Sequence, residues 1–370
     1  MEKILFLIHD LGQGGAEKVL VNLVNNMDRT KFDISVTVLF GGGVNEQFLK
    51  PDIHFRAVFS KEVPGNSKLM KLLTPEQLHR LCVKQHYDIE VSYLEGPSAR
   101  VVSGCPHSDT RLVCWIHSTL ASVQLASASF RSREEARRCY EKFQQIVCVS
   151  QITKESFMSV FPSVQNVAIL YNTVDSEAIL KQSVQQIPEN LFVDGTYSLL
   201  AMGSLKPVKG FDRLIRIHEN LKKDGYPVRT YILGRGPELQ NLRRQSELSG
   251  VADSVIFLGY DTNPYKYLSK SDIFVCSSWS EGFSTAATEA LIVGCPVCTV
   301  EVSGMKEMLG EHDEFGVVTE NSETALYQGV KRLLDAPSLL TGYKQRAAQR
   351  GKMFNTKNTV RAVEEMLLRL

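Results

Sequence analysis

The stretch Glu281-Gly-Phe-Ser-Thr-Ala-Ala-Thr-Glu289 decides how the second half of this chain folds. An apolar run at 272–277 precedes it and predicts a buried strand, and an alanine-rich run at 286–293 predicts the helix that follows. Unpaired backbone N–H groups and the positive end of the helix dipole attract anions to the start of such a helix. Ligands of parallel α/β sheets bind at this edge, so the sequence predicts an anion site flanked by two carboxylates.

The same strand-then-helix pattern runs along the whole chain and predicts an α/β fold with parallel sheets. Strands are predicted at 4–8, 33–40, 88–93, 111–116 and 145–149 in the first half, and at 198–202, 228–233, 255–258, 272–276 and 296–300 in the second. The polar stretch 162–194, interrupted by Pro188, predicts the link between them. We expect two Rossmann-like domains, 1–180 and 181–354, facing across a cleft, with the C-terminal helix 355–370 packing back on the first.

Composition excludes several classes of protein. The chain has 370 residues, 42 basic and 41 acidic, and this balance gives no reason to expect a nucleic-acid partner. Its eight scattered cysteines are typical of reduced thiols rather than a disulfide framework. Cys295-Pro-Val-Cys298 has the spacing of a redox or metal pair, but no second pair stands near it, so we interpret both as core thiols.

The N-terminus predicts a first strand and not a signal peptide, because its apolar run is short and ends at Asp10. No stretch reaches the roughly 18 apolar residues that a membrane span needs. We therefore expect a cytoplasmic protein whose contact with the inner membrane face is peripheral.

A glycine-rich loop, Leu11-Gly-Gln-Gly-Gly15, joins the first predicted strand to the first helix. Its glycines let a ligand approach the backbone, although a tight turn that binds nothing would look the same. Glu17 occupies the third glycine position of a dinucleotide fingerprint, and the second strand ends in glycines, 41–43, without an acid to hold a ribose. A nicotinamide enzyme is therefore disfavoured.

The loop 202–210 carries two lysines, Lys206 and Lys209, close to the start of a predicted helix. Cations are disfavoured there unless an anion is present, so Lys209 is a candidate for a diphosphate contact, with a solvated lysine as the alternative. A nucleotide sugar would fit such a site, because its phosphates could bind the backbone amides and its hydroxyls could bind the two carboxylates. No Asp-x-Asp motif or zinc spacing occurs, so we expect neither a metal nor another cofactor to be needed.

His117 directly follows the predicted strand 111–116, at the edge where ligands bind. A histidine at this position is a candidate for a functional group, but a satisfied structural histidine fits the same pattern. The sequence leaves this choice open.

Several motifs, in order along the chain, resemble the GT-B-fold retaining glycosyltransferases of family four that build bacterial surface polysaccharides. They are Gly14-Gly-Ala-Glu17, Trp115-Ile-His117, Leu170-Tyr-Asn-Thr-Val-Asp175, Lys209-Gly-Phe-Asp-Arg-Leu-Ile215, and Glu281 to Glu289 followed by Gly294-Cys-Pro-Val297. The resemblance implies a GT-B fold with an acceptor-side domain, 1–180, and a nucleotide-sugar domain, 181–354. It also implies transfer of a hexose or N-acetylhexosamine, with UDP as leaving group, to a saccharide that is lipid-linked.

The resemblance also implies roles for single residues. Glu281 would contact the sugar hydroxyls, Glu289 the ribose and Lys209 the diphosphate. The donor site would include Gly14, Gly15, Ser204, Gly282, Phe283, Ser284 and Thr285, and His117 would touch the transferred sugar. Ser204 stands where the family usually has arginine, which removes one cation from the diphosphate site, and Lys206 and Arg235 are candidates to compensate.

Two other functions remain open on this reading. One is a sugar-nucleotide epimerase or a phosphorylase on the same fold, and the other is a non-catalytic sugar-binding partner. The segment 122–143 is basic and carries Phe130, Tyr140 and Phe143, which is typical either of a helix lying on anionic lipid or of a solvated charged face.

Overall fold

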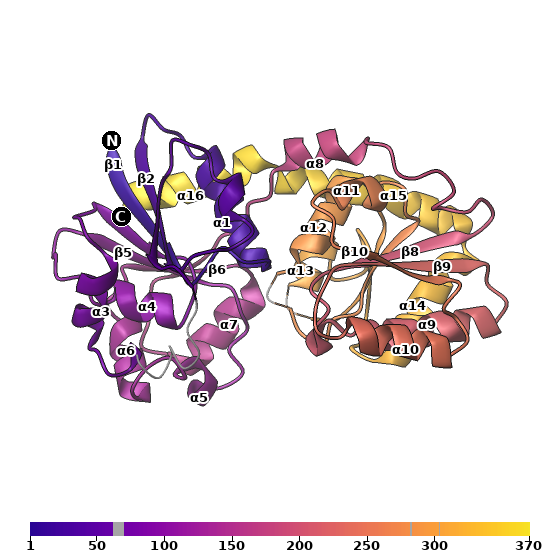
Figure 1. Cartoon of the computed structure of the whole chain (residues 1–370), viewed down its shortest axis with the longest axis horizontal. Helices are drawn as coiled ribbons and strands as arrows, with labels where there is room; N and C mark the ends of the chain where they lie inside the picture. Colours follow the sequence, from indigo (N-terminus) through magenta and orange to yellow (C-terminus); the bar gives the residue numbers. More distant parts are fainter. Residues whose placement is uncertain (62–69, 282, 303) are drawn as a thin grey trace. The chain divides into compact units, whose positions relative to one another are not determined.

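The structure is a computed structural model that describes residues 1–61, 70–281, 283–302 and 304–370 (Figure 1). It divides into two compact units, 1–173 with 356–370 and 174–355. The second unit therefore begins before the predicted position 181. The reason is that helix α8 (Ser176–Ser183) packs against α11 (Tyr265–Leu268) and α12 (Thr285–Ile292).

The first unit is built on a parallel sheet of seven strands in the order β3-β2-β1-β4-β5-β6-β7. The strands are β1 (Glu2–Ile8), β2 (Phe32–Phe40), β3 (His54–Phe59), β4 (Ile89–Ser92), β5 (Arg111–Ile116), β6 (Gln145–Cys148) and β7 (Val167–Ile169). The sequence analysis missed the two edge strands, β3 and β7, because Arg56 interrupts the apolar residues of β3 and β7 is only three residues long.

Helices cover both faces of this first sheet. They are α1 (Gly15–Asn26), α3 (Pro75–Cys82), α4 (Pro97–Val102), α5 (Val123–Ala126), α6 (Arg133–Tyr140), α7 (Gln151–Val160) and α16 (Thr356–Arg369), with the short 3-10 turn η1 (Glu46–Phe48). The C-terminal helix α16 packs on α1, and the Glu364 carboxylate accepts a hydrogen bond from the Asp28 N–H at 2.6 Å. Helices α3, α4 and α6 lie on the other face (Figure 1).

The second unit contains a parallel sheet of six strands in the order β10-β9-β8-β11-β12-β13. They are β8 (Tyr197–Met202), β9 (Val228–Leu233), β10 (Val255–Gly259), β11 (Ile273–Cys276), β12 (Val297–Val300) and β13 (Val317–Thr319). The chain order reverses between β8 and β11. The carboxyl ends of these two neighbours therefore form the switch point at which ligands of such sheets bind.

Helices α9 (Phe211–Lys223), α10 (Leu239–Leu248) and α14 (Glu323–Asp335) lie on one face of the second sheet, and α12 and α15 (Pro337–Gly351) lie on the other (Figure 1). Helix α13 (Met305–Leu309) and the turns η2 (Pro207–Lys209) and η3 (Lys352–Phe354) complete the unit. The two parallel sheets confirm the predicted α/β class. No helix in the described ranges is both long and apolar enough to cross a bilayer.

All eight cysteines are free, and every one except Cys105 is buried. Cys295 and Cys298 are 2% and 0% exposed, so they are the core thiols that the sequence predicted. Burial raises the pKa of Cys295 to about 12, which makes this thiol unreactive at neutral pH.

Candidate functional site

Lys209 and Glu281 form an ion pair at the carboxyl edge of the second sheet. The Lys209 Nζ donates to Glu281 Oε1 at 2.6 Å, and the Ser278 hydroxyl donates to the same oxygen at 2.6 Å. Lys209 ends η2 after β8, whereas Glu281 follows β11. They meet because β8 and β11 are neighbours in the sheet and end at the same edge. The two side chains are 26% and 13% exposed, so solvent and ligands can reach the pair.

Two loops are locked together beneath this ion pair. The Trp279 N–H donates to the Val208 carbonyl at 2.8 Å, and the Ser277 hydroxyl donates to the Lys209 carbonyl at 3.1 Å. Gly210 has a φ of 62°, and a Cβ at this position would lie 2.0 Å from the Ser277 oxygen. Only glycine allows the lysine loop to approach the glutamate loop this closely.

Arg213 holds the backbone that carries Ser278 and Glu281. This buried guanidinium donates from Nε to the Ser277 carbonyl and from Nη2 to the Ser278 carbonyl, both at 2.7 Å, and lies 3.9 Å from the centroid of the Trp279 ring. Burial lowers the pKa of Arg213. Sequence reasoning missed this residue, although a charged residue on the apolar face of a predicted helix was a visible signal.

Helix α12 begins where the sequence predicted it, and the binding of an anion at its start stays a prediction. Ser284 caps the helix by accepting a hydrogen bond from the Ala287 N–H at 3.2 Å. Thr285 is the first helical residue and is partly exposed, whereas Phe283 is buried with its ring 6.1 Å from that of Phe354. Gly282, predicted to offer an amide here, lies outside the described residues.

Glu289 is buried one turn further along α12, where Tyr265 donates a hydrogen bond to its Oε1 at 3.3 Å. Sequence reasoning did not find Tyr265. The tyrosine lies on α11, and this short helix is brought to Glu289 only by packing against α12. The hydroxyl therefore helps to orient a buried carboxylate.

Ser204 and Arg235 lie in adjacent loops after β8 and β9. These loops are joined by a hydrogen bond from the Leu205 N–H to the Arg235 carbonyl at 3.0 Å. The Arg235 guanidinium is exposed and stacks 4.8 Å from the centroid of the Tyr260 ring, and Lys206 is also exposed. Both cations that could compensate for Ser204 therefore belong to this edge of the sheet.

In the first unit, the predicted residues follow β1 and β5. Gly14 is the N-cap of α1 and Gly15 is its first residue, and both are exposed. His117 donates its backbone N–H to Glu95 Oε2 at 2.9 Å, and its ring lies 5.0 Å from that of Tyr93.

The ring of His117 is neutral and incompletely satisfied. Burial lowers its pKa to about 3, although the residue as a whole is partly exposed. Its Nε2 atom is buried and has no hydrogen-bond partner among the residues that the structure describes. Buried polar atoms are normally paired, so this nitrogen suits a ligand hydroxyl better than a purely structural role.

Of the two alternatives for segment 122–143, a lipid-facing helix does not fit its aromatic residues. Phe130, Tyr140 and Phe143 are buried in the core of the first unit, with Tyr140 on the inward face of α6 and the two phenylalanines just before and just after this helix. Arg137 forms ion pairs with Glu134 and Glu141 on the exposed face. Periodicity alone could not distinguish a face that binds lipid from one that packs on a sheet.

Comparisons with known proteins identify the family. Residues 13–178 match the family described as Glycosyltransferase Family 4, and residues 183–350 match Glycosyl transferases group 1. A Campylobacter jejuni protein is 30% identical over the whole length of both chains, and it is named N-acetylgalactosamine-N,N'-diacetylbacillosaminyl-diphospho-undecaprenol 4-alpha-N-acetylgalactosaminyltransferase. The amylovoran biosynthesis glycosyltransferase AmsD of Erwinia amylovora is 23% identical over 94% of this chain and 95% of its own.

Solved structures show the same fold. Anabaena HepE, crystallised in complex with UDP, superposes with a TM-score of 0.79 over the full length of both chains at 19% identity. Together with the family matches and two parallel Rossmann-like sheets, this likeness identifies the architecture. The chain therefore belongs to the GT-B glycosyltransferases of the family 4 type.

Proposed function

We propose that this glycosyltransferase moves a hexose or N-acetylhexosamine from a UDP-sugar to a lipid-linked saccharide, without a metal and with retention of the anomeric configuration. The observation that carries the proposal is the ion pair of Lys209 with Glu281 beside the start of α12. It brings together a cation for a diphosphate and a carboxylate for sugar hydroxyls. The names of the relatives support the choice: the Campylobacter enzyme has a diphospho-undecaprenol acceptor, and HepE was crystallised with UDP.

Donor binding is proposed to rearrange this ion pair. The diphosphate competes with Glu281 for the Lys209 ammonium, and the backbone amides at Ser284 and Thr285 add donors at the positive end of α12. Glu281 then turns to the sugar hydroxyls, still held by Ser278. Glu289, oriented by Tyr265, takes the ribose hydroxyls.

The roles proposed in the first unit are smaller. Gly14 and Gly15 offer an exposed backbone to the phosphates. The neutral His117 ring exchanges a hydrogen bond with the transferred sugar through Nε2. This role does not require His117 to change its protonation state.

The proposed reaction forms one bond and breaks one. The acceptor oxygen bonds to the anomeric carbon on the face that UDP leaves. The bond from that carbon to the phosphate oxygen breaks, its electron pair departs with UDP, and the acceptor proton passes to the leaving phosphate. With Glu289 engaged by ribose, the two carboxylates do not act as the acid and nucleophile of a retaining glycosidase.

The test is a calorimetric screen of UDP-sugars, followed by transfer to a polyprenyl diphosphate saccharide with Mg²⁺ and Mn²⁺ omitted. Nuclear magnetic resonance of the product should show the donor's anomeric configuration, and Glu281→Ala should abolish transfer. An inverted product, or transfer only with added metal, would contradict the mechanism. Conversion of the donor to its epimer without acceptor would favour the epimerase, and donor binding without turnover would favour the sugar-binding partner.

Peripheral membrane contact is proposed for the charged face of α6, not for its buried aromatic residues. Arg133 and Arg138 are exposed there, whereas Arg137 is engaged by two glutamates. Flotation with anionic liposomes should weaken in Arg133→Glu/Arg138→Glu more than in Arg137→Glu. Equal flotation of all three proteins, wild type included, would exclude docking through this face.

A further inference from the structure

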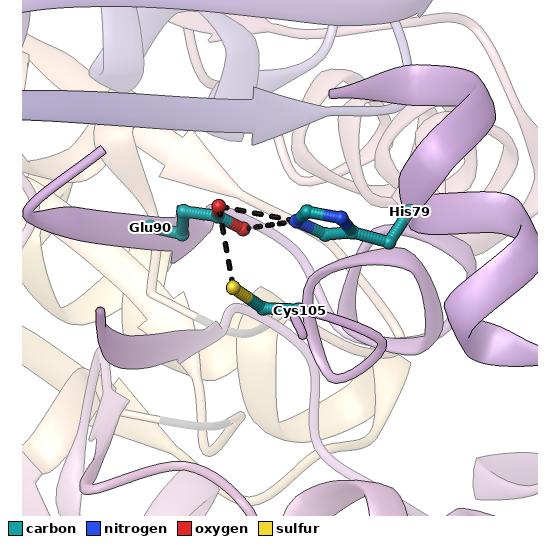
Figure 2. Close-up of side chains that lie close together, drawn as sticks. All are labelled: His79, Glu90 and Cys105. Carbon is teal, nitrogen blue, oxygen red and sulfur yellow. Dashed lines mark hydrogen bonds and ion pairs between the residues drawn. The ribbon is translucent and has the colours of Figure 1, made fainter. Parts of the chain in front are cut away.

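Three side chains capable of binding a metal meet inside the first unit (Figure 2). His79 comes from α3, Glu90 from β4 and Cys105 from the segment after α4. His79 Nε2 lies 2.8 and 3.1 Å from the two Glu90 carboxylate oxygens, and Cys105 Sγ lies 3.5 Å from Oε1. All three donor atoms lie within 4.8 Å of one another.

The position of Glu90 makes this cluster unusual. The carboxylate is 0% exposed, and its strand neighbours in register are Leu5 and Leu112. An apolar side chain would fit such a position without any loss of hydration, so a buried carboxylate there needs strong compensation. A histidine at 4% exposure and a thiol face it, and this combination of nitrogen, oxygen and sulfur is the donor set of zinc sites in proteins.

We propose that His79, Glu90 and Cys105 bind one Zn²⁺ ion, with water or the His107 carbonyl as the fourth ligand. Zinc–ligand distances of about 2.0–2.3 Å in a tetrahedron place the donor atoms roughly 3.3–3.7 Å apart. The sulfur and Oε1 already have this separation, and His79 and Glu90 need to part by only about half an ångström. The His107 carbonyl lies 4.0 Å from the Cys105 sulfur.

Charge and access also fit a metal ion. Zn²⁺ with one carboxylate, one thiolate and one neutral imidazole has no net charge, which suits a buried site. Cys105 is partly exposed, whereas the other seven cysteines are buried, so an ion can enter from its side.

The metal would act on structure rather than on sugar transfer. Glu90 is near the amino end of β4, away from the edge where Gly14 and His117 lie. A zinc ion there would tie α3, β4 and the segment after α4 to one another. The proposal therefore stands or fails independently of the proposed reaction.

The experiment uses the full chain, stripped of metal with a chelator and titrated with Co²⁺ as a spectroscopic substitute. Thiolate ligation gives an intense near-ultraviolet charge-transfer absorption. We expect this band to saturate at one equivalent in the wild type and to be lost in Cys105→Ala. Cys82→Ala, which removes a buried thiol from α3, should keep it.

A second control addresses the neighbouring surface group of His86, His107 and Asp109, which also has metal-binding side chains close together. His86→Asn/Asp109→Asn should retain the Co²⁺ band. It should also retain a rise in Tm on addition of Zn²⁺, a rise that Cys105→Ala lacks.

Failure of the wild type to develop the band would overturn the proposal, and so would a band that survives Cys105→Ala. Loss of the band in the surface variant would show that His86 or Asp109 helps to bind the thiolate-ligated metal, and would overturn the proposed set of ligands. Circular dichroism of Cys105→Ala checks its fold. The wild-type titration decides against the proposal by itself if no band forms, whatever the variants do.

Discussion

Replacing Glu281 with glutamine should strengthen the binding of UDP while abolishing sugar transfer. The Glu281 carboxylate lies 2.6 Å from the Lys209 ammonium that the diphosphate needs. Glutamine keeps the shape and can still accept the hydrogen bond from Ser278, but it removes the competing anion. Loss of the carboxylate should not remove any favourable contact with UDP itself, because only the sugar of a UDP-sugar is expected to contact Glu281.

The size of the effect follows from Coulomb's law. Two negative charges about 6 Å apart repel by about 0.7 kcal/mol in water and by about 3 kcal/mol at an effective dielectric constant of 20. The partial exposure of both side chains places the site between these limits. We expect a gain of about 1–2 kcal/mol, which corresponds to roughly 5- to 30-fold tighter UDP binding.

The assay is isothermal titration calorimetry of UDP at low and high salt. Glu247→Gln, which removes an exposed carboxylate on α10, is the charge-matched control and should leave the affinity unchanged. The double variant Glu281→Gln/Lys209→Met should bind UDP more weakly than Glu281→Gln, because both lack the repelling carboxylate but only the double variant lacks the ammonium that holds the diphosphate. Unchanged or weaker UDP binding by Glu281→Gln would refute the reasoning.

Three further outcomes are expected. Ser278→Ala removes a 2.6 Å hydrogen bond to the charged Glu281. We therefore expect kcat/KM of sugar transfer to fall about 10- to 100-fold while Tm stays nearly unchanged, and an unaltered kcat/KM would contradict this. Gly210→Ala should destabilise the second unit by about 1–3 kcal/mol, because the added Cβ would press on the Ser277 carbonyl. Urea unfolding measures this change, and an unchanged unfolding midpoint would disprove the contact. Burial lowers the pKa of His117 to about 3, so its neutral form contributes full stability above about pH 6.5 and loses it as the pH falls toward 3. Between pH 7.5 and 5 the loss should reach up to about 2 kcal/mol, and His117→Phe should reduce that dependence, as urea titrations at both pH values will show.

The sequence predicted what depends on local patterns. Continuous apolar runs identified buried strands such as β1, β8 and β11, because a strand covered on both faces is mostly apolar. The same signal was too weak for the edge strands β3, β7 and β13, which have few buried residues. The turn from β11 into α12 was predicted for the same reason, since strand, cap and helix are contiguous in sequence.

The tertiary structure decided what depends on neighbours distant in sequence. Lys209 and Glu281 are 72 residues apart, and only the adjacency of β8 and β11 makes them an ion pair. The sequence did not show that Arg213 and Tyr265 support the site, because their contacts with it form only when their helices pack in the folded unit. His79, Glu90 and Cys105 have no metal-binding spacing, because three separate elements supply them. Hydrophobic periodicity determines which face of an element is buried, but strand order and helix packing determine which side chains meet there.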